Sequence, residues 1–234
     1  VRLKVQGDGL WRGKLVPRDG AAWWASYKRF ILHYAVLSSD EGASMFSVGS
    51  ELGNMEPDDG RWRALIGEVR GVFGGALTYS ANWDHFTHVG FWDALDYVGV
   101  NAYHPITRDP KASEAELLSA WRLIRDRVLG WRAFVGRPLL FTEIGYPSVD
   151  GGAVRPYAHA ARGRVDLEEQ RRAYQAFVDA WDDQPDLGGV FVWLWTGDGG
   201  PADAGYSPRG KPAERVLRRW FGARAIDPTS ATDR

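Results

Sequence analysis

Short apolar runs alternate along the chain with longer stretches in which apolar residues recur at the period of a helix. Runs rich in β-branched and aromatic residues predict six strands, over residues 1–6, 44–50, 76–81, 97–103, 138–144 and 189–195. Repeated strand-then-helix units are typical of a parallel sheet, because parallel neighbours need long crossover connections. The pattern therefore predicts an α/β fold.

Residues that favour the start of a helix stand where several of the helical stretches begin. They are Asp19, Ser113 with Glu116, Asp166 with Glu169, and Pro212. Ser or Asp at the start, with Glu three positions later, caps the free backbone N–H groups of a first turn, and proline suits that turn. After the strand at 76–81, the pattern predicts a loop and only a short helical piece near residues 91–95.

Six strand–helix units in series fit two architectures. A (β/α)8 TIM barrel takes about 250 residues and eight strands, so six strands indicate a barrel that lacks its first two βα units. The alternative is a doubly wound open sheet, but no strand is followed by a Gly-rich phosphate fingerprint, and GDGG at 197–200 lacks its spacing. We expect one barrel domain over residues 1–222, an upstream segment before Val1, and a disordered tail over residues 223–234.

Composition narrows the class of protein. The net charge of -1 and pI near 6.6 supply no basic surface for nucleic acid. No apolar run approaches the roughly 18 residues of a membrane span. The absence of cysteine fits an extracellular and a cytoplasmic protein equally well, so the location stays open. The 12 tryptophans are more than a core needs, and such rings also stack on the apolar faces of ligands.

Two glutamates, Glu51 and Glu143, follow different strands at the end where a barrel has its catalytic face. Closure of the barrel would bring them across one cavity. Cleavage of a glycosidic bond needs such a pair, because one carboxylic acid protonates the leaving oxygen while a carboxylate meets the cationic sugar carbon. Taken alone, either glutamate is equally well explained by an ion pair with one of the 29 Lys and Arg residues.

Other polar and aromatic candidates stand near the strand ends. They are Lys4, Trp11, Ser50, Asn82, Trp83, Asn101, Tyr103, Tyr146, Trp193 and Trp195. Instead of binding substrate, the aromatic residues could pack inside the barrel or over its mouth. Lys4 could instead face outward, and Arg2 would lie on the same side because side chains alternate along a strand. The connection over residues 145–165 is expected to contact substrate, with a mobile surface loop as the alternative.

Neither a metal site nor a serine nucleophile is supported by the sequence. His85 and His88 are three positions apart, but no third ligand has suitable spacing, and there is no cysteine. The SVGSEL segment lacks the pattern of a nucleophile elbow, and the GDGGPAD loop lacks the ligand spacing of a calcium loop. We therefore expect no metal and no cofactor.

Several segments resemble the barrel of glycoside hydrolase family 113. They are LKVQGDGLWRG (3–13), FSVGSEL (46–52), LTYSANWD (77–84), FWDALDYVGVNAYHP (91–105), PLLFTEIGY (138–146) and AGYSPRGKPA (204–213). They occur in the family's order and cover residues 1 to about 222. Known members are retaining β-mannanases, so the resemblance implies endo-acting hydrolysis of β-linked polysaccharide, with β-1,4-mannan as the favoured substrate.

The resemblance also implies roles for single residues. Glu51 would be the general acid/base and Glu143 the nucleophile of a double displacement. Tyr103 matches a tyrosine that orients the nucleophile. Trp195, or else Trp193, matches the tryptophan platform beneath the sugar.

Ser50 departs from the pattern of the wider clan, which usually has asparagine immediately before the acid/base to hold the sugar 2-hydroxyl. Asn82 or Asn101 would then take over that contact. Two other functions stay open: a different β-glycanase or β-glycosidase of the same clan, and a catalytically silent barrel that binds carbohydrate or serves as a structural module. The presence of both glutamates argues against the silent barrel.

Overall fold

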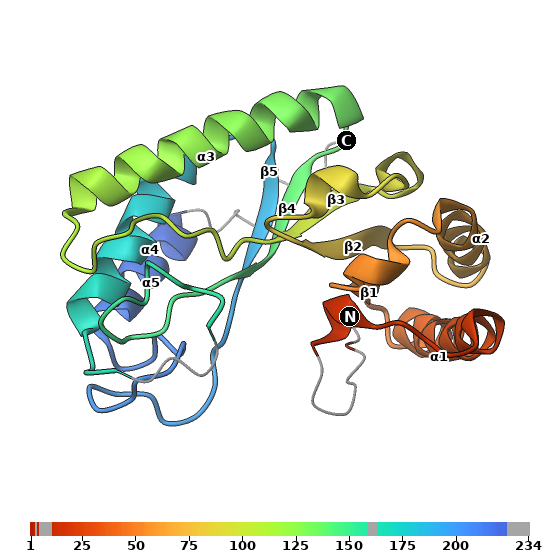
Figure 1. Ribbon diagram of the computed structural model, residues 1–234, viewed down its shortest axis with the longest axis horizontal. Helices are drawn as coiled ribbons and strands as arrows, with labels where there is room; N and C mark the ends of the chain where they lie inside the picture. Colours follow the sequence, from red (N-terminus) through yellow and green to blue (C-terminus); the bar gives the residue numbers. More distant parts are fainter. Residues whose placement is uncertain (3, 5–10, 159–162, 224–234) are drawn as a thin grey trace. The chain divides into compact units, whose positions relative to one another are not determined.

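The computed structural model describes residues 1–2, 4, 11–158 and 163–223 of the 234-residue chain (Figure 1). Contacts between Cα atoms divide the chain into two compact units, which are described separately. Unit 1 comprises Val1–Ala102, Val128–Ile144 and Pro185–Phe191, and unit 2 comprises Tyr103–Arg127, Gly145–Gln184 and Val192–Arg234. Most of the predicted tail, from residue 224 on, lies outside the described residues, as do positions 159–162 of the 145–165 connection and most of the strand expected over residues 1–6.

Within the part of the chain that the structure describes, the sheet has five strands, in the order in which they occur along the chain. They are β1 (Met45–Ser50), β2 (Ala76–Asn82), β3 (Tyr97–Asn101), β4 (Leu139–Ile144) and β5 (Leu187–Val192). The β1–β2, β2–β3 and β3–β4 pairs are parallel, as the alternation of strands and helices predicted. The register sets Asn82 opposite Asn101, and Asn101 opposite Glu143, so polar residues of three strands meet at one end of the sheet.

The first and last predicted strands differ from expectation. Of residues 1–6, the described part forms a parallel bridge between Arg2 and Ser47, and the Ser47 N–H donates to the Val1 carbonyl at 2.8 Å. β5 ends at Val192, so Trp193 and Trp195 lie beyond the strand and not within it. Because Trp193 and Trp195 are apolar, the sequence pattern of a strand extends past Val192, where the strand itself ends.

The predicted helix starts are confirmed. The described residues form five α-helices: α1 (Gly20–Asp40), α2 (Asp59–Arg70), α3 (Glu114–Val135), α4 (Leu167–Trp181) and α5 (Pro212–Ala223). Asp19 accepts from the Ala22 N–H at 2.9 Å, and Asp166 from the Glu169 N–H at 2.8 Å. The short piece expected near residues 91–95 is the 3-10 turn Trp92–Ala94. Two further 3-10 turns, Arg12–Lys14 and Gly53–Met55, precede and follow Glu51 in the sequence.

An aromatic cluster joins α1 and α2 to β2 in unit 1. The buried Trp62 ring of α2 lies 5.1 Å from Trp24, 5.8 Å from Tyr27 and 5.1 Å from Tyr79, measured between ring centroids. A Cβ atom at Gly49 would lie within 2.8–2.9 Å of Tyr79, Trp62 and Tyr27 atoms, so this position near the end of β1 has no room for a side chain. Glycine thus lets the cluster close against the end of β1, two residues before Glu51.

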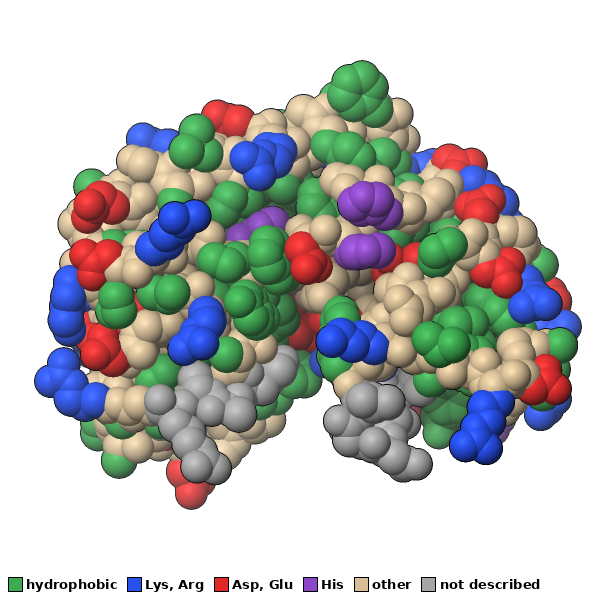
Figure 2. All heavy atoms as spheres, viewed as in Figure 1, with side chains coloured by type: hydrophobic (Ala, Val, Ile, Leu, Met, Phe, Trp, Pro, Cys, Tyr) green, Lys and Arg blue, Asp and Glu red, His purple; other side chains and the backbone are tan. Residues whose placement is uncertain are grey.

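Acidic and basic side chains are interspersed over the face shown in Figure 2, in keeping with the net charge of -1. Among the helices of the described residues, none is long and apolar enough to cross a membrane. In unit 2, α4 and α5 pack on each other, with the Phe177 and Trp220 rings 5.6 Å apart.

Candidate active site

Glu51 occupies an unusual backbone position directly after β1. Its φ angle is 54°, and it is the only residue other than glycine with positive φ among those that the structure describes. This left-handed conformation costs an L-residue about 1–2 kcal/mol, and such strain concentrates at functional sites. The Glu51 N–H donates to the Ser80 carbonyl of β2 at 2.9 Å, which ties the turn to the neighbouring strand.

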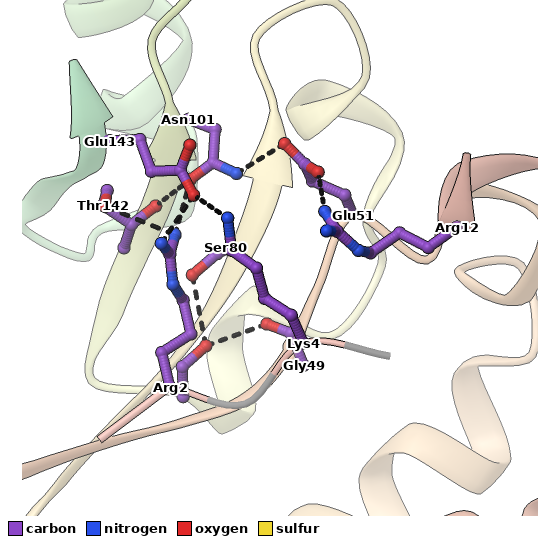
Figure 3. A network of polar contacts seen from close by, with 10 residues as sticks. Arg2, Lys4, Arg12, Gly49, Glu51, Ser80, Asn101, Thr142 and Glu143 are labelled. Carbon is purple, nitrogen blue, oxygen red and sulfur yellow. Dashed lines mark hydrogen bonds and ion pairs between the residues drawn. The ribbon is translucent and has the colours of Figure 1, made fainter. Parts of the chain in front are cut away.

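Both carboxylate oxygens of Glu51 accept hydrogen bonds (Figure 3). The Asn101 side-chain amide donates to Oε1 at 2.6 Å, and the Arg12 guanidinium contacts Oε2. Glu51 is 8% exposed. A buried carboxylate loses hydration, and these two donors replace it.

Glu143, near the end of β4, is paired with two cations. Its Oε1 lies 2.5 Å from an Arg2 nitrogen and 2.6 Å from the Lys4 Nζ, while its side chain is 2% exposed. Burial lowers the pKa of Lys4, and the nearby Glu143 carboxylate opposes that shift. The buried Glu143 carboxylate therefore has two basic partners among the first four residues of the chain.

Asn101 connects the two glutamates. Its Oδ1 accepts from Arg2 at 3.1 Å and from the Thr142 hydroxyl at 2.8 Å. Because guanidinium can only donate, this contact sets which way the amide points and directs its NH2 group at Glu51. A continuous polar path therefore runs from Glu51 through Asn101 and Arg2 to Glu143 (Figure 3).

The remaining candidates in unit 1 lie at or near strand ends. Ser50 is buried, and within the described part of the chain no group hydrogen-bonds its hydroxyl. Asn82 and Trp83 are half-buried at the end of β2. Trp11 is 47% exposed, with its ring against Gly13.

Four candidates belong to unit 2. Tyr103 is buried, with its ring 6.2 Å from that of Tyr206. Tyr146 is also buried, and its hydroxyl accepts from the Trp121 indole at 2.9 Å, a contact typical of a core residue. Trp193 is half-buried, whereas Trp195 is 43% exposed and has the Arg218 guanidinium 5.9 Å from its ring centroid.

Two site residues, Arg2 and Arg12, were not among the candidates chosen from the sequence. Side-chain alternation did place Arg2 on the same side as Lys4, and both contact Glu143. Arg12 lies in a 3-10 turn, where no strand or helix period indicates its direction.

One group of acidic residues in unit 2 has the spacing of metal ligands. Asp150, Asp166 and Glu169 offer oxygen atoms within 4.8 Å of one another. However, Glu169 accepts from the Gly151 and Ala153 N–H groups at 2.8 Å each, and Asp166 caps α4. Burial raises the pKa of Glu169. These contacts explain the group as an anchor of the loop before α4.

The model of Glycoside Hydrolase Family 113 matches residues 6–209 of the chain. The chain belongs to this family. The resemblance found in the sequence is thereby confirmed, and the protein is a glycoside hydrolase. Among curated proteins, none matches the chain.

Solved structures of the same family are similar over most of the chain. The β-mannanase from Alicyclobacillus acidocaldarius, in complex with ManMIm, has a TM-score of 0.82 and 33% identity, with 93% of this chain and 70% of that one covered. A second family 113 β-1,4-mannanase has a TM-score of 0.80 and 28% identity, with 92% and 70% covered. These matches confirm the predicted α/β fold as part of a TIM barrel.

A more distant structure shows how widely this fold is shared. The β-glucuronidase from Faecalibacterium prausnitzii has a TM-score of 0.62 at 17% identity, with 85% of this chain and 35% of that one covered. At this identity the match concerns the fold alone.

Proposed function

We propose that the protein is a retaining, endo-acting β-1,4-mannanase that uses Glu51 and Glu143 in a double displacement. The observation that supports this most strongly is the polar path joining the two buried carboxylates from separate strands. The choice of mannan rests on the family 113 structures, whose names describe β-mannanases.

In the first step, a Glu143 oxygen attacks the anomeric carbon and forms a covalent glycosyl-enzyme, while Glu51 gives its proton to the departing glycosidic oxygen. In the second step, Glu51 removes a proton from water, which attacks the anomeric carbon and releases Glu143. Arg2 and Lys4 hold Glu143 Oε1 and thereby orient the carboxylate for attack.

Several residues would bind the sugar in this proposal. Ser50 precedes Glu51, and its buried hydroxyl has no hydrogen-bond partner in the described part of the chain, which makes it a candidate donor to a sugar hydroxyl. The exposed rings of Trp11 and Trp195 are suited to stacking on sugar faces. By contrast, both polar groups of the Asn101 amide already serve the network, so Asn101 orients Glu51 and Asn82 is the better candidate for a sugar contact.

Hydrolysis of β-mannan, glucomannan, xylan and β-glucan tests the substrate, and proton NMR of the first product tests retention. Glu143→Gln and Glu51→Gln keep the side-chain shape but remove the charge, and we expect turnover to fall by about 10²–10⁴-fold for Glu51→Gln and at least as far for Glu143→Gln. Glu68→Gln is the matched control, because Glu68 lies on α2 in an exposed pair with Lys28.

Inversion at the anomeric carbon, or full activity of either glutamine variant, would contradict the proposed mechanism. Faster hydrolysis of xylan or β-glucan than of mannan would favour another glycanase of the clan. Binding of mannan without any hydrolysis would favour a silent carbohydrate-binding barrel.

A further inference from the structure

A buried chain of hydrogen bonds runs from the backbone beside Glu51 to the surface. The Leu52 N–H donates to the Tyr79 hydroxyl at 2.8 Å, and this hydroxyl donates to Glu56 Oε1 at 2.9 Å. Glu56 Oε2 is paired with His85 Nδ1, also at 2.9 Å. Tyr79 and Glu56 are buried, whereas His85 is 48% exposed.

The burial of Glu56 needs a reason, because a buried carboxylate is costly unless it is paired and hydrogen-bonded. Its carboxylate oxygens contact two side chains, one from β2 and one from the turn after it. Burial and the Glu56 charge raise the pKa of Tyr79 well above its ordinary value, so the phenol keeps its proton. Tyr79 therefore accepts from the backbone and donates to Glu56 at the same time.

These hydrogen bonds begin at the residue next to Glu51, whose backbone is strained. Two consecutive N–H groups, those of Glu51 and Leu52, are held by two consecutive residues of β2, Ser80 through its carbonyl and Tyr79 through its hydroxyl. The Glu51 N–H belongs to the peptide before its Cα and the Leu52 N–H to the peptide after it, so the two bonds together restrain the φ and ψ angles of Glu51 and with them the direction of its side chain. In this conformation Glu51 is left-handed and accepts from the Asn101 amide.

We infer that Tyr79 and Glu56 are positioning residues for the general acid/base, which act by holding the Glu51 backbone in its left-handed conformation. The inference rests on the proposed function, since it assigns them a part in the work of Glu51. Neither residue was a candidate from the sequence, and neither need touch the substrate.

Tyr79→Phe removes the hydroxyl and keeps the ring. The matched control is Tyr27→Phe: Tyr27 is also buried, also packs on Trp62, and donates one hydrogen bond to the Val48 carbonyl of β1 at 2.8 Å. We expect similar losses of Tm for both variants. For Tyr79→Phe, kcat on mannan should fall by about tenfold to a hundredfold with KM within about twofold, because part of the acid/base contribution is lost. For Tyr27→Phe, kcat should stay within about twofold of wild type.

Leaving-group dependence separates positioning from a general loss of structure. A misplaced acid/base slows mannan cleavage more than cleavage of 2,4-dinitrophenyl β-mannobioside, whose leaving group needs no proton. Azide, an external nucleophile that needs no general base, should accelerate turnover of this substrate by Tyr79→Phe and give the β-glycosyl azide. Azide should have no effect on Tyr27→Phe.

A conservative pair at position 56 provides an independent test if Tyr79→Phe does not fold. Glu56→Gln keeps an acceptor for the Tyr79 hydroxyl, whereas Glu56→Met does not. We expect Glu56→Gln to retain several times the kcat of Glu56→Met on mannan. Equal kcat values for this pair, or for the two Tyr→Phe variants, would overturn the inference.

Failure of the proposed function would look different. In that case the wild-type protein would not turn over either substrate, or Glu51→Gln would be as active as wild type. With an active wild type and an inactive Glu51→Gln, the tyrosine and Glu56 variants decide the positioning role alone.

Discussion

Glu51 combines a buried charge with a backbone conformation that glutamate disfavours. Its carboxylate accepts from Asn101 and Arg12. Its φ angle is 54°, and its N–H donates to the Ser80 carbonyl of β2. Neither feature improves folding stability on its own. Sites that retain such costs usually do so for function, which supports a catalytic role for this residue.

Replacing Glu51 by glycine or by alanine isolates the backbone cost, since both changes remove the carboxylate. Glycine accepts positive φ without strain, so we expect Glu51→Gly to be more stable than Glu51→Ala by about 1 kcal/mol. This reverses the usual order of the two residues. Urea unfolding of both variants measures it, and an alanine variant as stable as the glycine variant would show that the turn relaxes when the side chain is lost.

Sequence patterns identified the candidate site residues near strand ends, but not the residues that hydrogen-bond to the backbone beside them. Glu51, Glu143, Lys4 and Asn101 stand at strand ends or beside them, and the structure brings all four into one network. Tyr79, by contrast, lies within a strand and has the pattern of a core residue, and Glu56 lies in a polar turn. Positive φ at Glu51 was equally hidden, because glutamate does not signal a left-handed turn.

Helix boundaries were predictable wherever a side chain caps the first turn. Ser113 and Glu116 form the expected reciprocal bonds at the start of α3. No side-chain cap precedes α2, and its Gly60 and Gly67 weaken the helical signal. Tertiary packing of Trp62 and its neighbours stabilises that helix instead, and such packing cannot be read from local sequence.

The capping box of α3 should make stability depend on acid pH. Bonds from the Ser113 hydroxyl and N–H hold the pKa of Glu116 below its ordinary value of 4.5. A carboxyl whose pKa is lower in the folded state adds stability above its unfolded pKa and loses it as pH falls through the folded value. We expect the Tm difference between wild type and Glu116→Gln to persist from pH 7 to about 5 and to shrink below about pH 4. A difference that stays constant to pH 3 would contradict this.

Lys211 anchors two loops of unit 2 at the start of α5. Its side chain is fully buried, 2.7 Å from the Ser148 hydroxyl and 3.0 Å from Asp203. Lys211→Met leaves Asp203 without this ammonium, and we expect a loss of about 2–4 kcal/mol in unfolding free energy. Lys28→Met, which breaks an exposed pair with Glu68, should cost less than about 1 kcal/mol. Equal costs in chemical denaturation would show that the buried contacts add nothing.

At the scale of the whole molecule, the ion pairs of Glu143 have a structural role that is separate from the proposed reaction. Through Arg2 and Lys4 they attach the first residues of the chain to β4, while the Ser47 N–H donates to the Val1 carbonyl. The fold class was predictable from the alternation of strands and helices. The long-range contacts of Arg2 and Lys4 with Glu143 were not predictable, because a local sequence pattern does not indicate which charged residues will form ion pairs.

Glu143→Gln should therefore loosen the start of the chain as well as stop turnover. It leaves two partly buried cations beside a neutral amide, and we expect a loss of about 2–3 kcal/mol in stability. Hydrogen exchange at the Ser47 amide should become faster, while Glu68→Gln leaves it unchanged. Unchanged protection at Ser47 would mean that the first residues are held by other contacts.

Under relaxed selection, Glu51 and Glu143 should be lost at different rates. Glu51 has a left-handed backbone, whereas Glu143 is paired with two cations. In a duplicated gene that is still selected for abundance but no longer for activity, exchange of Glu51 for glycine or asparagine relieves backbone strain and leaves one cation, Arg12, without its carboxylate, whereas exchange of Glu143 relieves no strain and leaves two, Arg2 and Lys4. Inactive descendants of this barrel should therefore lose Glu51 early and keep Glu143, which still contributes to stability after activity is lost.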